Sequence, residues 1–298
     1  MEDRLERKYG ELKSRIASEE KAAIAFSGGV DSVLLLYVAK EALGDRAVAL
    51  TVSLCAVPER ELALAREFCR RFGIRHRIEK VDEFTIQGFG ENPPNRCYLC
   101  KRALFTRMRA AADEEGIAFL AEGSNVDDQG DYRPGLAALG ELGIASPLKD
   151  AGFTKAEIRQ MAERLGLSDW NRPSSACLAS RFAYGEEITP EKLKRVEQAE
   201  AYLEDLGFTQ KRVRVHKNLA RVELLPEELP RLFHKGLAGK VSRRLKELGF
   251  AYVTLDLDGF QSGSMNRELE SGSMNKEPEN GSMNEEPEND SMNKELGT

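Results

Sequence analysis

Strand-like and helix-like segments alternate over about the first 170 residues of this chain, and this alternation constrains its fold more than any other feature. Short apolar runs predict strands at 21–26, 47–53, 74–81 and 117–122. Helical periodicity predicts helices between them at 31–43, 59–72 and 99–115. Because a strand that follows such a helix returns parallel to the previous strand, the order predicts an α/β fold with a doubly wound parallel sheet.

The pattern changes near Tyr184, where a second kind of domain is predicted. A helix is expected at 189–206, followed by strands at 211–216 and 220–225, two helical stretches and a strand at 251–257. This order predicts a small α+β domain and is compatible with a ferredoxin-like layer. We therefore assign residues 1–183 to the α/β domain and residues 184–261 to a domain for substrate binding or oligomerisation.

Residues 262–298 form a tail of low complexity. The tripeptide Ser-Met-Asn begins at Ser264 and recurs with a period of nine residues, and the tail has few apolar residues besides methionine. A calcium-binding β-roll is disfavoured because the Gly-Gly and Asp positions that it needs are missing. Such a composition cannot bury enough surface to offset the entropy of ordering, so the tail is predicted to be disordered.

Charge and hydropathy exclude several classes of protein. The tail carries three basic and nine acidic residues, so it accounts for the whole net charge of −6 and leaves a balanced body. A balanced body has no overall field that attracts nucleic acid, so no nucleic-acid partner is expected. The N-terminus is densely charged and no apolar run is long enough to span a membrane. We expect a soluble, cytoplasmic protein with no membrane partner.

The segment Ser27-Gly28-Gly29-Val30-Asp31-Ser32 lies where the first predicted strand ends and the first predicted helix begins. Glycines there let the backbone turn sharply and present N–H groups to a phosphate, and the helix adds the positive end of its dipole. Ser27 and Ser32 can donate hydroxyl hydrogen bonds, and Asp31 can bind Mg²⁺. The alternative, a glycine turn that only packs strand against helix, is disfavoured by this position.

This loop lacks the Gly-Lys-Ser/Thr ending of loops that serve cleavage of the γ-phosphate, and it resembles the PP-loop ATP pyrophosphatase family. The resemblance implies that ATP is cut between the α- and β-phosphates and that AMP passes to a substrate oxygen. It also implies that Thr51 and Ser53 bind adenosine, and that the segment 122–128, with Gly123, Asn125 and Asp128, contributes to the nucleotide site. For the acidic segment alone, a solvated loop with helix-capping aspartates is the alternative.

Five cysteines without an export signal do not indicate a disulfide framework. Cys55 and Cys69 are expected to be buried as small apolar residues in a strand and a helix. Cys97 and Cys100 form a C-x-x-C pair, and Cys177 lies far along the chain among small and polar residues. No histidine is near these three cysteines, so a closed zinc site is disfavoured, whereas three thiolates suit a 4Fe-4S cluster with one open iron. A redox disulfide between Cys97 and Cys100 remains an alternative.

Further segments make the resemblance more specific. The segments 123–135, 173–181, 212–216 and 255–260, together with the loop at 27–32, closely resemble the LarE-type sulfur transferases of nickel-pincer cofactor synthesis. This resemblance implies adenylation of a carboxylate of pyridinium-3,5-biscarboxylic acid mononucleotide and its conversion to a thiocarboxylate for the cofactor of lactate racemase. It also implies ATP and Mg²⁺ as cofactors, a small-molecule substrate, sulfide or another sulfur donor, and a homo-oligomer.

The resemblance offers two sources of sulfur. In members with a single cysteine, the residue that matches Cys177 gives up its own sulfur and becomes dehydroalanine. Members with the additional C-x-x-C pair carry an iron–sulfur cluster. Cys97, Cys100 and Cys177 place this chain in the second group, with supplied sulfide and repeated turnover.

Four basic residues are candidates for binding anions. Arg212 and Arg214 alternate on a predicted strand, so both face one side and can fork onto the phosphate of the mononucleotide. Lys101 and Arg181 lie beside the cysteines and can neutralise pyrophosphate or the adenylate. Solvated surface charge is the alternative for both pairs.

Two other functions fit parts of this pattern. A tRNA thiolase also combines this ATP loop with a cysteine-ligated cluster, but the balanced body and the lack of an RNA-binding domain disfavour it. A non-catalytic ATP sensor would use the same loop, but it would leave the three cysteines without a role.

Overall fold

The structure is a computed structural model that describes residues 2–130, 134–167 and 177–261. The predicted disordered tail, 262–298, lies outside the described residues. Within the described part of the chain, no helix is long and apolar enough to cross a bilayer.

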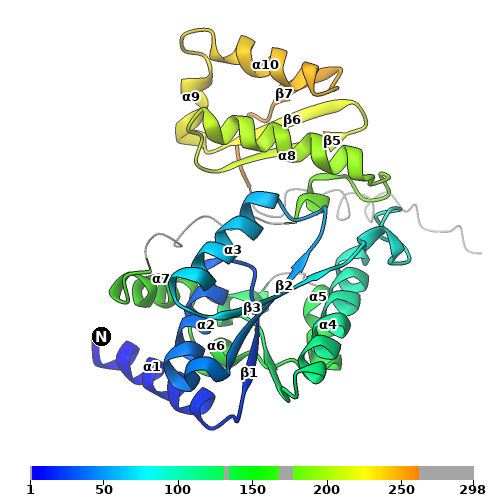
Figure 1. The fold of residues 1–298 in the computed structure, drawn as a ribbon. Coiled ribbons are helices and arrows are strands. Elements are labelled where there is room, and N and C mark those ends of the chain that lie inside the picture. The colour runs from blue at the N-terminus through cyan, green and yellow to red at the C-terminus, as the bar shows by residue number, and fades with distance from the viewer. Residues whose placement is uncertain (1, 131–133, 168–176, 262–298) are drawn as a thin grey trace, which may run out of the picture.

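A four-stranded parallel sheet forms the centre of the first domain, as the alternation predicts (Figure 1). Its strands lie in the order β3-β2-β1-β4. Their bounds are Ala22–Ala25 for β1, Ala47–Ser53 for β2, Arg75–Lys80 for β3 and Phe119–Ala121 for β4. A further parallel bridge joins Ala121 to Ala145 beyond β4.

Helices cover both faces of this sheet (Figure 1). They are α1 (Glu2–Ala17), α2 (Val30–Leu43), α3 (Glu59–Arg71), α4 (Arg96–Glu114), α5 (Pro134–Glu141), α6 (Pro147–Asp150) and α7 (Lys155–Arg164). Successive residues of a strand point to opposite faces, so Ala22 and Ile24 pack with α1, α2, α3 and α7, whereas Ala23 packs with α4 and α5. The chain is therefore doubly wound. Helix α1 was not predicted, and it buries Leu12 and Ile16.

The second domain contains a three-stranded sheet in the order β5-β6-β7 (Figure 1). Its elements are α8 (Pro190–Asp205), β5 (Lys211–His216), β6 (Leu219–Leu224), α9 (Leu229–Leu232), α10 (Leu237–Glu247) and β7 (Tyr252–Leu255). Strands β5 and β6 form an antiparallel hairpin, but β7 pairs directly with β6 in parallel. The ferredoxin-like interpretation is therefore wrong, because α9 and α10 carry the chain back to the edge of β6 with no strand between.

The segment 177–188 joins the two domains. Leu178 and Phe182 are buried in the core of the second domain, and Phe182 bridges to Val215 of β5. The backbone N–H of Leu178 also donates to Ala56 O, at the carboxyl end of the first sheet. This segment therefore contacts both domains, and it places Cys177 between the two sheets.

Cys55 and Cys69, the two cysteines that were predicted to be buried, differ from each other in the structure. Cys69 is buried against the core on α3, as predicted. Cys55 is exposed, and the prediction of burial is wrong for it because β2 ends at Ser53 and Cys55 follows in a turn.

Candidate active site

The glycine-rich loop forms a closed turn between β1 and α2. Gly28 has a φ of 79°, a conformation that glycine adopts without strain. The Ser32 hydroxyl donates to Gly29 O at 2.9 Å, and Ser27 N donates to the Ser32 hydroxyl at 3.3 Å. The first amides of α2 have no carbonyl partner inside the helix, so the loop presents N–H groups at the positive end of the helix dipole.

Asp31 lies on the first turn of α2 and forms an ion pair with Lys155. Its Oδ1 is buried and has no hydrogen-bond partner among the described residues. Burial raises the pKa of Asp31, while the Lys155 ammonium opposes this rise and the Asp128 carboxylate adds to it. A buried carboxylate oxygen without a partner, close to a second carboxylate, fits a hard cation such as Mg²⁺.

Lys155 connects the glycine loop with the acidic loop that follows β4. Its Nζ donates to Asp31 Oδ2, and its backbone N–H donates to Asp127 Oδ2 at 2.7 Å. Sequence reasoning missed Lys155. The signal available for its position is the capping box of α7, in which the Thr154 hydroxyl accepts from Glu157 N.

The acidic loop packs directly against the glycine loop. A Cβ at Gly123 would lie 3.0 Å from Ser32 N and 3.2 Å from the carbonyl carbon of Asp31, so the two backbones approach closely. Asn125 N donates to Asp128 Oδ2 at 2.9 Å, which closes the loop. The structure thus brings Gly123 and Asp128 to the loop at 27–32.

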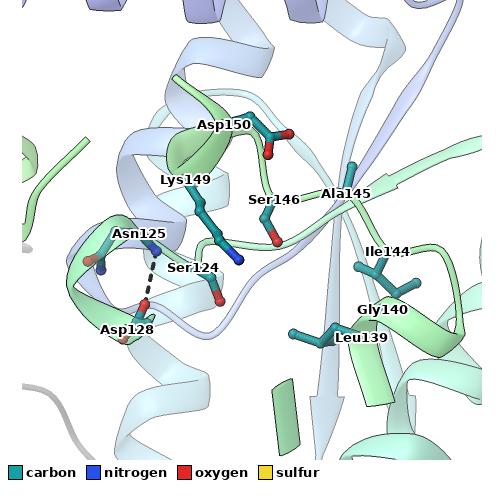
Figure 2. Close-up of a pocket in the computed structure, with 10 residues that line it drawn as sticks. All are labelled: Ser124, Asn125, Asp128, Leu139, Gly140, Ile144, Ala145, Ser146, Lys149 and Asp150. Carbon is teal, nitrogen blue, oxygen red and sulfur yellow. Dashed lines mark hydrogen bonds between the residues drawn. The ribbon is translucent and has the colours of Figure 1, made fainter. Parts of the chain in front are cut away.

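A pocket of about 290 Å³ lies beside this acidic loop, between it and α5 and α6 (Figure 2). Asn125 and Asp128 line one side, and Lys149 ends between Ser124 and Ser146 in the view of Figure 2. No residue of the glycine loop lines this pocket. Asn125 and Asp128, which were predicted to bind the nucleotide, therefore line a pocket that the glycine loop does not line.

Thr51 ties together three neighbouring strands, reaching the carboxyl end of β1 and the start of β3. Its hydroxyl donates to Phe26 O at 2.7 Å and lies 2.8 Å from His76 Nε2. Since that hydroxyl has one hydrogen, Nε2 of His76 is the donor to Thr51. Burial, with the nearby Arg66 cation, lowers the pKa of His76 to about 4. Of the two residues predicted to bind adenosine, Thr51 is thus buried, whereas Ser53, the last residue of β2, is half-buried.

The three cysteines converge around the start of α4. Cys97 is exposed, Cys100 is buried, and Cys177 is half-buried. Burial raises the pKa of Cys100 to about 12, and the nearby Cys177 and Cys97 thiols add to the rise. All five thiols are free. In the described residues, no three His, Cys, Asp or Glu side chains stand close enough together to form a metal site as they are.

Buried arginines and glutamates surround the carbonyl side of Cys177. Arg181 forms two hydrogen bonds with Glu200, at 2.8 and 2.9 Å, and a third from Nη1 to Cys177 O at 3.2 Å. Arg214 pairs with Glu223, which is fully buried, and donates from Nη1 to Ser180 O at 3.0 Å. Arg181 and Arg214 therefore hold the segment that carries Cys177.

Arg212 lies on the same face of β5 as Arg214, as the alternation predicts. It is 9% exposed, its Nη1 donates to Lys211 O, and its guanidinium lies 5.1 Å from the ring centre of Phe260. Burial and the neighbouring Arg181 cation lower the pKa of Arg212 to about 10, so it keeps its charge at neutral pH. Glu200 and Glu223, which offset these cations, were not predicted, although Glu223 pairs with Arg212 in the hairpin register.

Lys101 lies on α4, one turn after Cys97. A Cβ at Gly135 would lie 2.5 Å from Lys101 Cδ, so this side chain passes over the start of α5. The predicted site residues thus fall into two groups. One group surrounds the glycine and acidic loops, and the other surrounds Cys177, with Lys101 between α4 and α5.

Comparisons with known proteins agree with this geometry. Residues 1–131 match the PP-loop domain family. The chain is 36% identical over 263 residues to the pyridinium-3,5-bisthiocarboxylic acid mononucleotide synthase of Lactiplantibacillus plantarum. The aligned residues cover 88% of this chain and 95% of that protein. It is 44% identical to an uncharacterized protein of Synechocystis, over 89% of this chain and 99% of that protein. An uncharacterized protein of Methanocaldococcus jannaschii is 30% identical over 84% of this chain and 94% of its own length.

A parallel sheet with this glycine loop at the β1–α2 junction defines an ATP-utilising enzyme of the PP-loop class. Within that class, the chain belongs to the LarE-type sulfur transferase family. Family membership confirms the predicted fold class, the use of ATP and the transfer of sulfur.

The close approach at Gly123 yields a prediction. Replacing Gly123 with Ala should raise the KM for ATP on the order of tenfold, because the new Cβ pushes the start of α2 away from the acidic loop. Gly140→Ala on α5 is the matched control, since a Cβ there meets nothing within 4 Å. Pyrophosphate release at varied ATP measures both variants, and equal KM values would contradict the assigned contact.

Proposed function

We propose that this enzyme adenylates a carboxylate of pyridinium-3,5-biscarboxylic acid mononucleotide with ATP and converts it to a thiocarboxylate, for the nickel-pincer cofactor of lactate racemase. The relative from Lactiplantibacillus plantarum is named as a synthase of the bisthiocarboxylic mononucleotide and supports this substrate. One observation carries the proposal most directly. The carbonyl oxygen of Cys177 accepts a hydrogen bond from Arg181, whose charge also acts on Arg212, so Cys177 lies near the arginines proposed to bind the substrate phosphate.

In the first half-reaction, a carboxylate oxygen of the substrate attacks the α-phosphorus of ATP. The bond from the α-phosphorus to the bridging oxygen breaks, and pyrophosphate leaves with that oxygen. The loop amides at 27–32 bind the phosphates, and Asp31 Oδ1 would hold Mg²⁺, which would supply positive charge to the phosphate oxygens.

In the second half-reaction, the sulfur of supplied hydrosulfide attacks the carbonyl carbon of the acyl adenylate. The bond from carbon to the adenylate oxygen breaks and AMP leaves with that oxygen. The thioacid then loses its S–H proton to solvent and becomes the thiocarboxylate. Arg212 and Arg214 bind the substrate phosphate and hold the carboxylate near Cys177, which is the positioning that such a step requires. Arg181 acts through its hold on Cys177 O, since it is 1% exposed and paired with Glu200.

We propose that Cys97, Cys100 and Cys177 hold a 4Fe-4S cluster, a group that suits three thiolates. Three thiols that influence one another's charge suit iron better than zinc, because no histidine near them in the sequence can supply a fourth ligand. Such a cluster would supply an iron able to bind sulfide. The protein's own part is to hold the end of the segment 177–182 next to α4, where Asn92 Nδ2 donates to Phe182 O and Ala183 O.

The ATP half-reaction is tested with Asp31→Asn. A neutral amide is a weak ligand for a hard cation. The rate of Mg²⁺-dependent pyrophosphate release should therefore fall by a factor of about 100 or more, the loss expected when one group that stabilises the transition state is removed. Thermal unfolding should show an intact fold. Unchanged pyrophosphate release from the variant would remove Asp31 from the metal site.

The substrate phosphate is tested with Arg212→Gln, which keeps Arg214 and its pair with Glu223. Loss of one charge-assisted interaction costs about 1.5–3 kcal/mol, so the KM for the mononucleotide should rise about tenfold or more while that for ATP changes little. Equal changes for both substrates would place Arg212 outside the phosphate site.

The sulfur source is tested by changing each of Cys97, Cys100 and Cys177 to Ser in anaerobically purified protein. The wild type should carry about four irons per chain, and each variant should lose iron and sulfur transfer but keep adenylation. Cys55→Ser is the matched control, because that thiol is exposed and outside the site. A sacrificial mechanism gives another pattern, in which only Cys177→Ser abolishes transfer and active protein loses the mass of hydrogen sulfide.

A further inference from the structure

Phe260 lies at the carboxyl end of the second domain and has no role in the function proposed above. Its ring centre lies 5.1 Å from the guanidinium carbon of Arg212, within the range of a cation–π interaction. Among the described residues, three apolar clusters form the cores, and Phe260 belongs to none of them. The ring is therefore placed against a cation and not in a core.

A tight turn after β7 brings Phe260 to this place. Gly259 has a φ of 73°, and Phe260 N donates at 2.7 Å to the carbonyl oxygen of Leu224, the last residue of β6. A Cβ at Gly259 would lie 2.8 Å from the same oxygen, so glycine is required for this close approach. Leu224 pairs with Lys211 in the hairpin, so Phe260 is fixed at the level of the start of β5, where Arg212 lies.

Arg212 needs support because it lies among like charges. Burial lowers its pKa, and the Arg181 and Arg214 cations lower it further. Nη1 of Arg212 donates to Lys211 O at 2.7 Å, which fixes one edge of the guanidinium. A ring face attracts a cation without using its N–H groups, so the ring stabilises the guanidinium and leaves donors for a phosphate.

We propose that Phe260 is a positioning residue for the substrate phosphate: its ring holds the Arg212 guanidinium against the sheet and leaves N–H donors of that guanidinium to the phosphate of the mononucleotide. This inference rests on the proposed function in taking Arg212 as a ligand of that phosphate. Phe260 acts through Arg212 and not on the reacting atoms. Its loss should therefore weaken binding of the mononucleotide while kcat and the KM for ATP stay nearly unchanged.

The test compares Phe260→Leu with Phe260→Tyr in the full chain, with pyrophosphate release measured at varied concentrations of each substrate. Leucine removes the ring, so the KM for the mononucleotide should rise about fivefold, which corresponds to roughly 1 kcal/mol for a lost cation–π interaction. Tyrosine keeps the ring and should stay within about twofold of wild type. Equal KM values for Phe260→Leu and wild type would overturn the inference.

Two comparisons separate this role from a structural one. Phe233→Leu removes a ring that is 69% exposed in the same domain, and it should leave both KM values unchanged. In the Arg212→Gln background, Phe260→Leu should add nothing to the KM for the mononucleotide, because the ring then has no cation to hold. Additive effects of the two changes would show that Phe260 acts by another route and would overturn the inference.

Gly259→Ala provides a second route if Phe260→Leu does not fold. This variant keeps the ring, but its new Cβ meets Leu224 O and displaces Phe260 from β6, so the KM for the mononucleotide should rise here too. Gly236→Ala is the matched control, since Gly236 has a φ of 68° and a Cβ there meets nothing within 4 Å. The same KM in both glycine variants would contradict the role of Phe260.

Calorimetric titration with the mononucleotide in the absence of ATP distinguishes this inference from the proposed function. A wild type that binds the mononucleotide about fivefold more tightly than Phe260→Leu, yet releases no pyrophosphate with ATP, would overturn the proposed function and support the role of Phe260. Equal affinities of the two proteins, with pyrophosphate release by the wild type, would overturn the role of Phe260 alone. A wild type that does not bind the mononucleotide would overturn both.

Discussion

The buried ion pair between Arg181 and Glu200 holds the site together more than any other interaction. Arg181 is 1% exposed, and both of its hydrogen bonds to Glu200 are shorter than 3 Å. The same guanidinium reaches back to Cys177 O, and Glu200 accepts from Val213 N on β5. One pair therefore connects helix α8, strand β5 and the segment that carries the sulfur. Removing one partner of such a pair leaves an uncompensated charge and costs about 3–5 kcal/mol.

Much of the nucleotide half of the molecule could be predicted from the sequence, for a physical reason. Strands buried on both faces read as apolar runs, and parallel strands place their following loops at one edge of the sheet. The position of Ser27 to Ser32 at the first such edge, and of Gly123 at a later one, then follows from chain order. The shared face of Arg212 and Arg214 follows from the two-residue period of a strand.

The remaining features depend on contacts that local patterns do not encode. Lys155 meets Asp31 across 124 positions, and nothing in the composition around it indicates that partner. Cys55 was expected to be buried in a strand, but it lies in a turn beyond the correctly predicted end of β2, and its exposure depends on how that turn packs. The parallel pairing of β7 with β6 is set by the path of α9 and α10. A sequence pattern predicts that a helix or strand is present far better than it predicts which residues or strands lie beside it.

The hydrogen bonds that join Phe26, Thr51 and His76 make the stability of this part of the sheet sensitive to acid. The folded protein keeps His76 neutral down to a pKa of about 4, whereas in the unfolded chain the imidazole titrates near its ordinary value of 6.5. Between these two values the unfolded chain binds more protons than the folded one, so protonation favours unfolding as the pH falls through this window. Above it, the contribution of His76 to stability is complete and independent of pH. The strands that carry the nucleotide loop are thus most stable at neutral pH, and acidification destabilises them through His76.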